Sequence, residues 1–140
     1  MIDNDITPNE EVVAICQSAL RRMLAETNGI VFSLVATVDG FEIASEATSG
    51  WDIAVDRIAA MASSGHALGD TVARELTAKN CNNVIIDADK LSVVFLAVPE
   101  FDNPPLILGA AATKSESLGT VLYAARNCVR QIGKATTTSI

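Results

Sequence analysis

A tight-turn signal between two strand-like runs constrains the fold more than any other feature of the sequence. Residues 30–38 are rich in β-branched and aromatic side chains, and residues 41–47 resume an alternating pattern after Asp39-Gly40. An Asp-Gly pair between two such runs favours a hairpin, because these residues tolerate the positive φ that a two-residue turn requires. The two runs are therefore predicted to be neighbouring antiparallel strands.

A long helix whose surface is made largely of small residues is predicted next, from about Trp51 to Ala78. One stripe at helical spacing is expected to face the sheet. It contains Ile58, Met61, Ala62, Gly65, Leu68, Gly69, Val72 and Leu76. Trp51 itself is expected to act as a lid on the helix start, with a binding anchor as the alternative.

A second side of this helix is poor in long charged side chains and is expected to be smooth. Such a surface suits close packing against the same helix of a second copy across a twofold axis. We therefore predict a homodimer whose interface contains Ala59, Ala60, Ser63, Ser64, Ala67 and Thr71. The alternative left open is that these small residues only permit tight packing onto the domain's own sheet.

The remaining patterns complete one α+β domain over residues 1–140, with a core of about 8–133 and a frayed tail at 134–140. A capping pattern at residues 7–10 starts a first helix that ends near Asn28-Gly29, and a last helix begins near Leu118. Strands are predicted at 84–87, 91–98 and 106–112, with an exposed loop from Pro99 to Pro105. The order α-β-β-α-β-β-β-α predicts an antiparallel sheet with helices on its faces.

The composition excludes several classes of partner. The formal net charge of −7 disfavours binding to a nucleic acid backbone or to an anionic membrane surface. No apolar run approaches the roughly 18–20 residues of a membrane helix, and the acidic start of the chain does not resemble a signal peptide. We expect a cytoplasmic protein without direct membrane insertion.

The sequence contains no recognisable catalytic signature. Ser63, His66 and Asp70 share one side of the long helix but lack a nucleophile elbow and an oxyanion donor. The segment 108–115 resembles a phosphate-binding loop only superficially, because Leu108 and Thr113 stand where that motif requires glycine. The expectation is a protein that is not an enzyme and has no catalytic residues.

Metal and cofactor sites are not expected either. With a single histidine and no dense carboxylate spacing, the chain is poorly supplied with metal ligands. Cys16, Cys81 and Cys128 are widely separated and lack any CxxC spacing, so they are expected to be free thiols, with Cys16 and Cys128 buried in helix patterns. We predict no metal and no cofactor.

The sequence resembles the Roadblock/LC7 domains, in particular the bacterial and archaeal members associated with small Ras-like GTPases. The resemblance rests on the order of elements from about Glu10 to Gly133 and on residues 35–45, followed by 56–61, Leu68-Gly69 and 117–119. It implies a five-stranded antiparallel sheet in a profilin-like sandwich, with the long helix on one face and the two terminal helices on the other. It also implies a homodimer in which long helices pair and edge strands join the two sheets.

The same resemblance implies two functional hypotheses. The first is a homodimeric, non-catalytic signalling protein that regulates the GTP hydrolysis or nucleotide state of a small Ras-like GTPase through protein–protein contacts. Arg57, His66, Asp70 and Arg74 are then the expected partner contacts, with Arg57 or Arg74 as a less favoured arginine finger. The alternative is a passive dimeric adaptor or scaffold subunit that does not respond to the nucleotide.

Overall fold

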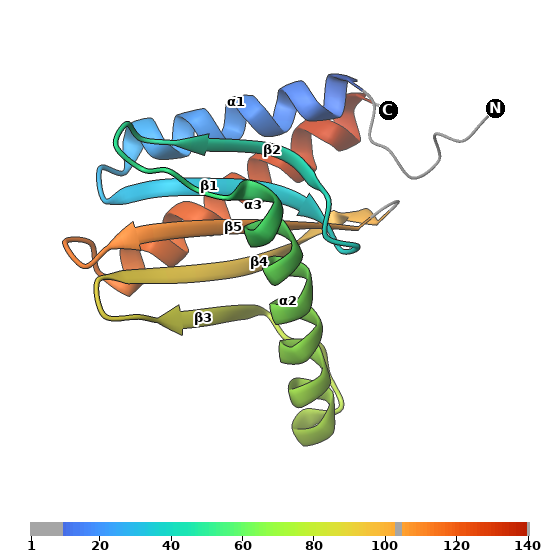
Figure 1. Ribbon diagram of the computed structural model, residues 1–140. Coiled ribbons are helices and arrows are strands. Elements are labelled where there is room, and N and C mark those ends of the chain that lie inside the picture. The colour runs from blue at the N-terminus through green and yellow to red at the C-terminus, as the bar shows by residue number, and fades with distance from the viewer. Residues whose placement is uncertain (1–9, 103–104, 140) are drawn as a thin grey trace.

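Three helices and five strands make up the protein in the computed structural model, which describes residues 10–102 and 105–139 (Figure 1). The elements, in chain order, are α1 (Glu10–Glu26), β1 (Ile30–Thr37), β2 (Glu42–Ala47), α2 (Val55–Thr77), β3 (Asn83–Asp87), β4 (Leu91–Asp102), β5 (Pro105–Thr113) and α3 (Leu118–Ser139). The predicted α-β-β-α-β-β-β-α order is confirmed.

The strands form one antiparallel sheet in the order β2-β1-β5-β4-β3, so β2 and β3 are its two edges. The predicted hairpin is confirmed, because β1 pairs antiparallel with β2. Gly40 has a φ of 96°, and its backbone N–H donates to the carbonyl of Thr37. Glycine adopts this φ readily because it has no Cβ, whereas Asp39, also expected to tolerate a positive φ, does not adopt one.

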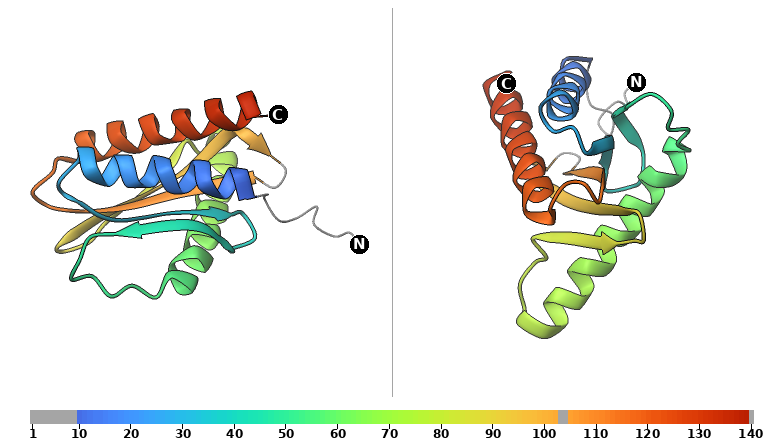
Figure 2. Two further views of the ribbon diagram at one scale, coloured as in Figure 1. Left: turned by 90° about the horizontal axis from the view of Figure 1, so that it is seen from above. Right: turned by 90° about the vertical axis from the view of Figure 1, so that its left-hand side faces the viewer.

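The helices cover opposite faces of the sheet, as predicted. α1 and α3 lie side by side on one face, and α2 crosses the other (Figures 1 and 2). Strand alternation separates the two cores: Val94 and Leu96 of β4 pack under α1 and α3, whereas Val93 and Phe95 face α2. The fold is therefore an α+β sandwich with a five-stranded antiparallel sheet in the middle.

Three predicted boundaries are wrong. α2 begins at Val55, so residues 51–54 precede the helix. β4 continues through Pro99 to Asp102, where the sequence suggested a loop. α3 continues to Ser139 beyond Gly133, because the buried Thr136 hydroxyl donates to the carbonyls of Ile132 and Gly133 and holds the last turns against the core. The capping residues 7–9 and two loop residues, 103 and 104, lie outside the described part.

α1 begins and α3 ends at the same end of the molecule (Figure 1).

Within the described ranges, no helix has the length and apolar character needed to cross a membrane.

Candidate interaction surface

Helix α2 extends past the edge of its own sheet (Figures 1 and 2). It approaches the edge strand β3 near Gly69, where an added Cβ would lie 2.6 Å from Cγ2 of Val84. The eight residues from Asp70 to Thr77 follow this contact, which corresponds to roughly 12 Å of helix at 1.5 Å per residue. The last third of α2, residues 70–77, therefore projects from the protomer as an overhang.

The side of α2 that touches the sheet is lined by small residues. Ala59 and Ala62 are fully buried, and an added Cβ on Gly65 would lie 3.3 Å from the ring of Phe95. Small side chains let the helix axis come close to the sheet. The helix is consequently rotated so that its small residues, rather than its large apolar ones, face the strands.

The prediction that the large apolar residues of α2 face the sheet is therefore wrong in part. Met61, Leu68, Val72 and Leu76 are exposed by 57%, 66%, 50% and 78%. The last three recur every four residues and lie along one line of the helix. We refer to Met61, Leu68, Val72 and Leu76 as the apolar flank.

An apolar cavity of about 300 Å³ lies beside the apolar flank, between α2 and the strands. Trp51, Ile58 and Met61 form one wall, and Ile86, Val93 and Phe95 contribute from β3 and β4. Its lining is almost entirely apolar. Trp51 lies four residues before Val55, the first residue of α2, so it lines this cavity from the segment that precedes the helix and is partly exposed.

The six residues predicted for the dimer interface fall into two groups. Ala59 has no exposed surface in the protomer, and the hydroxyl of Ser63 donates to the carbonyl of Val38 in the β1–β2 turn. These two side chains are engaged within their own domain. Ala60, Ser64, Ala67 and Thr71 are exposed, although Ala60 also lies against the turn, 3.4 Å from an ideal Cβ on Gly40.

Three of the four predicted partner contacts form a local network at the end of α2. Asp70 accepts a hydrogen bond from the backbone N–H of Cys81 at 2.8 Å, and its Oδ2 lies 3.4 Å from Arg74 and 3.9 Å from His66. Arg74 also donates from Nε to Asn80 at 3.1 Å. The network ties the overhang to the turn before β3. Arg57 is exposed in the first turn of α2, roughly 25 Å along the helix from Arg74.

The side chains considered for chemistry have structural partners. The Ser63 hydroxyl donates to Val38 rather than to His66, so the structure does not bring Ser63, His66 and Asp70 together as a nucleophile and base. Lys114 follows β5, in the segment 108–115 that was compared with a phosphate-binding loop, and it pairs with Asp87. Within residues 10–102 and 105–139, no three His, Cys, Asp or Glu side chains gather as a metal ligand set.

The cysteines are free, and two are buried as predicted. Cys16 of α1 and Cys128 of α3 lie in the core beneath these helices, where burial raises the pKa of each thiol to about 12. Burial is the larger cause for Cys128, and the neighbouring Cys16 also contributes to its raised pKa. Such thiols remain protonated and unreactive at neutral pH.

Comparison with solved structures identifies the class of fold: the chain has the Roadblock/LC7 fold. MglB from Myxococcus xanthus matches with a TM-score of 0.81 and 16% identity, covering 96% of this chain and 96% of that one. A structure described as MglB with tetrameric arrangement matches with a TM-score of 0.83 and 13% identity over 99% and 100% of the two chains. A Roadblock/LC7 domain from Streptomyces avermitilis matches with a TM-score of 0.75 and 12% identity over 86% and 97%.

No protein-family model and no curated protein sequence matches the chain. The resemblance noted from the sequence is confirmed at the level of the fold.

The apolar flank is the part of this surface that sequence reasoning missed. Its signal was visible in the four-residue spacing of Leu68, Val72 and Leu76. That spacing was assigned to the core because periodicity alone does not say whether an apolar side is covered by the same chain or by another.

Proposed function

We propose that the chain is a non-catalytic homodimeric regulator of a small Ras-like GTPase, acting through protein–protein contacts that modulate its GTP hydrolysis or nucleotide state. The observation that carries the proposal is the apolar flank on an overhanging helix beside an apolar cavity. Exposed apolar side chains gathered along one line mark an interaction site. The Roadblock/LC7 fold and the likeness to MglB support a GTPase as the regulated partner.

The homodimer we propose uses the apolar flank in place of the small-residue side. The overhang of one protomer would lie across the sheet of the other, with Leu68, Val72 and Leu76 beside the partner's cavity. The edge strand β3 borders this region and has its outer edge open for pairing with a second sheet. In an isologous arrangement of this kind, the twofold symmetry forms every contact twice.

Burial of the apolar flank would offset much of the free-energy cost of association. Full burial of a large apolar side chain contributes about 1.5–3 kcal/mol. Flank residues that are half or more exposed in the protomer would gain about half of that, so four of them on each of two copies would contribute roughly 6–12 kcal/mol. This is comparable with the estimated cost of about 4–15 kcal/mol for association.

Self-association is tested by analytical ultracentrifugation of the wild type and two variants. We expect a dimer for the wild type, a monomer for Leu68→Asp/Val72→Asp, and a dimer for Thr71→Asp, which adds a carboxylate to a neighbouring exposed position off the flank. A monomeric wild type, or a Thr71→Asp variant affected as strongly as the flank variant, would overturn this interface.

The regulatory role is tested by affinity capture from a lysate of the source cell, run in parallel with excess GTPγS and excess GDP. A small GTPase enriched in one nucleotide state supports the proposal, and its hydrolysis rate can then be measured with Arg57→Ala and Arg74→Ala variants. An unchanged rate of GTP hydrolysis with both variants would show that neither Arg57 nor Arg74 acts as an arginine finger. Recovery of proteins other than GTPases, equally in both states, would instead support a passive adaptor.

A further inference from the structure

The two edge strands of the sheet differ in how far their outer backbone groups are already bonded. At β2, the side chain of Gln17 on α1 donates to the outward carbonyl of Ser45 at 2.7 Å, so α1 covers part of that edge. At β3, the Cys81 thiol donates to the carbonyl of Asn83 at 3.0 Å, and a carbonyl oxygen can accept a second bond. β3 is therefore the edge at which a second sheet can be added.

The pairing of β3 with β4 decides which backbone groups face outward. At the turn between them, the N–H of Ala88 donates to the carbonyl of Leu91 at 2.9 Å. Antiparallel ladders alternate between hydrogen-bonded and non-hydrogen-bonded pairs, so Asn83, Ile85 and Asp87 fall in the non-hydrogen-bonded pairs with β4. Their N–H and C=O groups consequently point away from β4, toward the open edge.

Twofold symmetry leaves few ways for β3 to pair with itself. A hydrogen-bonded pair needs an outward-facing residue on both copies, so the pairing is centred on a residue that lies opposite itself. Centring on Ile85 places Asn83 opposite Asp87 of the other copy and gives every outward-facing residue a partner. Centring on any other residue of β3 leaves at least one of them without a partner in the strand.

The position of α2 selects the same register. α2 crosses β3 at Gly69, over Val84, so the separation of the two Val84 residues fixes the spacing of the two helices. Centring on Ile85 offsets the helices by two residues, or about 7 Å, along the strands. Centring on Val84 would superimpose them, and centring on Ile86 would separate them by about 14 Å. Packed helices lie about 8–10 Å apart, which favours the first arrangement.

The overhang of α2 matches the spacing of the strands that it would cross in a second copy. Gly69 touches the sheet, and Val72 and Leu76 follow three and seven residues later on the same side of the helix. They lie about 4.5 Å and 10.5 Å beyond Gly69 along the helix. The first two strands of a joined sheet would lie about 4.8 Å and 9.6 Å beyond β3. Val72 therefore reaches β3 of the other copy, and Leu76 reaches its β4.

We propose that two copies join their β3 strands with Ile85 opposite Ile85, so that Val72 and Leu76 of each α2 cover the cavity of the other copy. The proposal rests on the homodimer proposed above and specifies its register. Ile86 and Val93 are paired on β3 and β4, and both line the cavity, so the overhang reaches the two strands that carry the cavity wall. The exposed flank and the hollow beside it then cover one another.

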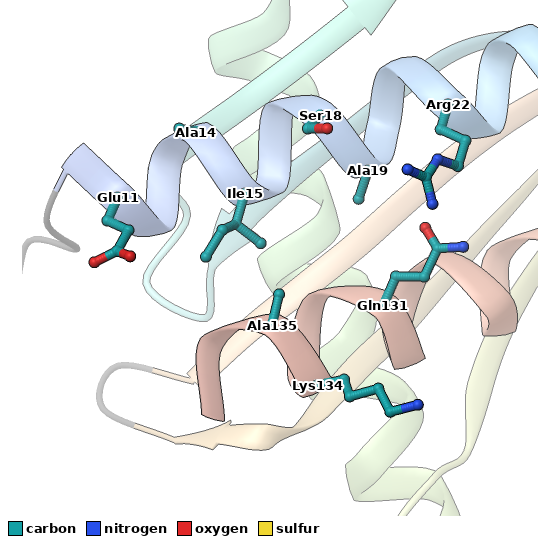
Figure 3. Close-up of a pocket in the computed structure, with 9 residues that line it drawn as sticks. All are labelled: Glu11, Ala14, Ile15, Ser18, Ala19, Arg22, Gln131, Lys134 and Ala135. Carbon is teal, nitrogen blue, oxygen red and sulfur yellow. The ribbon is translucent and has the colours of Figure 1, made fainter. Parts of the chain in front are cut away.

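The opposite face of the sheet is less suited to a second copy. Among the residues that line the hollow between α1 and α3 are Glu11, Arg22 and Lys134, and Ile15 is the one large apolar side chain in that lining (Figure 3). Covering these charged groups would cost their hydration. The apolar contact that a second copy requires therefore lies on the α2 face.

Cysteine cross-linking in a Cys81→Ser background tests the register, because each register brings a different residue opposite itself. Under oxidised glutathione, we expect Ile85→Cys to form a disulfide-linked dimer at least ten times faster than Val84→Cys or Ile86→Cys alone. A mixture of Val84→Cys and Ile86→Cys chains should cross-link, since these two positions face one another across the axis. The mixture also serves as the control that both thiols can react.

Sedimentation tests the burial of the overhang. Leu76→Ala should weaken self-association at least ten-fold, because the twofold symmetry removes the contact twice. Leu118→Ala makes the same substitution at another exposed leucine, at the start of α3 on the other face, and should change self-association less than two-fold.

The possible failures are distinguishable. A wild type that sediments as a monomer would overturn the homodimer and the register together. A dimeric wild type in which Val84→Cys or Ile86→Cys alone cross-links as fast as Ile85→Cys would overturn the register and leave the homodimer. A dimer without a cross-link in any variant, or one unaffected by Leu76→Ala, would likewise overturn this arrangement, because β3 or the overhang would then lie outside the interface.

Discussion

At the scale of single residues, burial separates the three cysteines. Cys16 and Cys128 lie beneath α1 and α3, whereas Cys81 is half-buried after α2 and its thiol donates to the carbonyl of Asn83 at 3.0 Å. A buried thiol loses reactivity because the thiolate is costly in apolar surroundings. The reactivity of Cys16 and Cys128 therefore reports on the core, and that of Cys81 reports on the turn between α2 and β3.

We expect one thiol, that of Cys81, to react quickly with a thiol reagent in the folded protein at pH 8, and all three to react after unfolding. Reaction kinetics with peptide mapping measure this, and Cys81→Ser should abolish the fast phase. Fast modification of Cys16 or Cys128 in the folded state would contradict the burial argument.

The raised thiol pKa values also give stability a pH dependence. Unfolded thiols lose their protons near pH 9, while Cys16 and Cys128 stay protonated in the fold until about pH 12. The unfolded state then binds fewer protons, so these two groups lower the free energy of unfolding as pH rises from about 9 to 12. Below pH 9 they contribute no pH dependence.

In α1 and α3, sequence patterns were a good guide to which residues are buried but not to which atoms meet. Cys16 and Cys128 were predictable because they fall within apolar helix stripes. The bond from Ser63 to the carbonyl of Val38 was not, because it joins residues far apart in the chain. It depends on how α2 is rotated above the β1–β2 turn, and neither helical periodicity nor turn chemistry fixes that rotation.

At the scale of elements, the packing of α2 on the sheet depends on close approach. Gly65 and Gly69 face Phe95 and Val84, and these contacts decide which side of the helix is buried. The apolar stripe predicted for α2 is only partly buried: its small residues Ala62, Gly65 and Gly69 face the sheet, whereas the apolar flank is exposed. A side covered by another molecule has the same periodicity as one covered by its own sheet.

Replacing Gly69 with alanine is expected to destabilise the protein. The new Cβ would lie 2.6 Å from Cγ2 of Val84 and force α2 away from β3. Overpacking costs about 1–3 kcal/mol, against a gain of about 1 kcal/mol from helix propensity, so the net loss should reach up to about 2 kcal/mol. Urea unfolding measures the change in the free energy of unfolding.

Gly119→Ala is the matched control for Gly69→Ala. It makes the same substitution in α3, where the nearest atom to the added Cβ is the Ser117 hydroxyl at 3.9 Å. We expect its stability to be unchanged or slightly raised. A Gly69→Ala variant as stable as Gly119→Ala would show that α2 can move away from β3 at no cost.

At the scale of the whole molecule, the two faces of the sheet present different surfaces. The α2 face carries the apolar flank and its cavity, and the other face carries α3, whose charged residues are Arg126, Arg130 and Lys134. The order and pairing of elements followed from turn signals and periodicity, which act locally. The placement of charge and apolar surface on opposite faces could not be predicted from these local signals. It depends on the sheet order, which joins strands distant in the sequence.

The single tryptophan should report the proposed dimer. Trp51 lines the cavity beside Ile58 and Met61, so covering the apolar flank would remove water from its ring. We expect its emission to shift to shorter wavelengths as concentration rises, with the same midpoint as the change in sedimentation mass. The Leu68→Asp/Val72→Asp variant should keep the long-wavelength emission throughout, and a concentration-independent wild type would contradict the expectation.

The start of α1 and the end of α3 share one end of the molecule, and this determines how the protein tolerates attachment. The start of α1 and the end of α3 also lie on the face of the sheet opposite α2, so a fluorescent protein or surface tether joined through either helix would attach on that face. The long helix on the far side would still face solvent. Fusions through α1 or α3 would therefore leave assembly through the long helix intact.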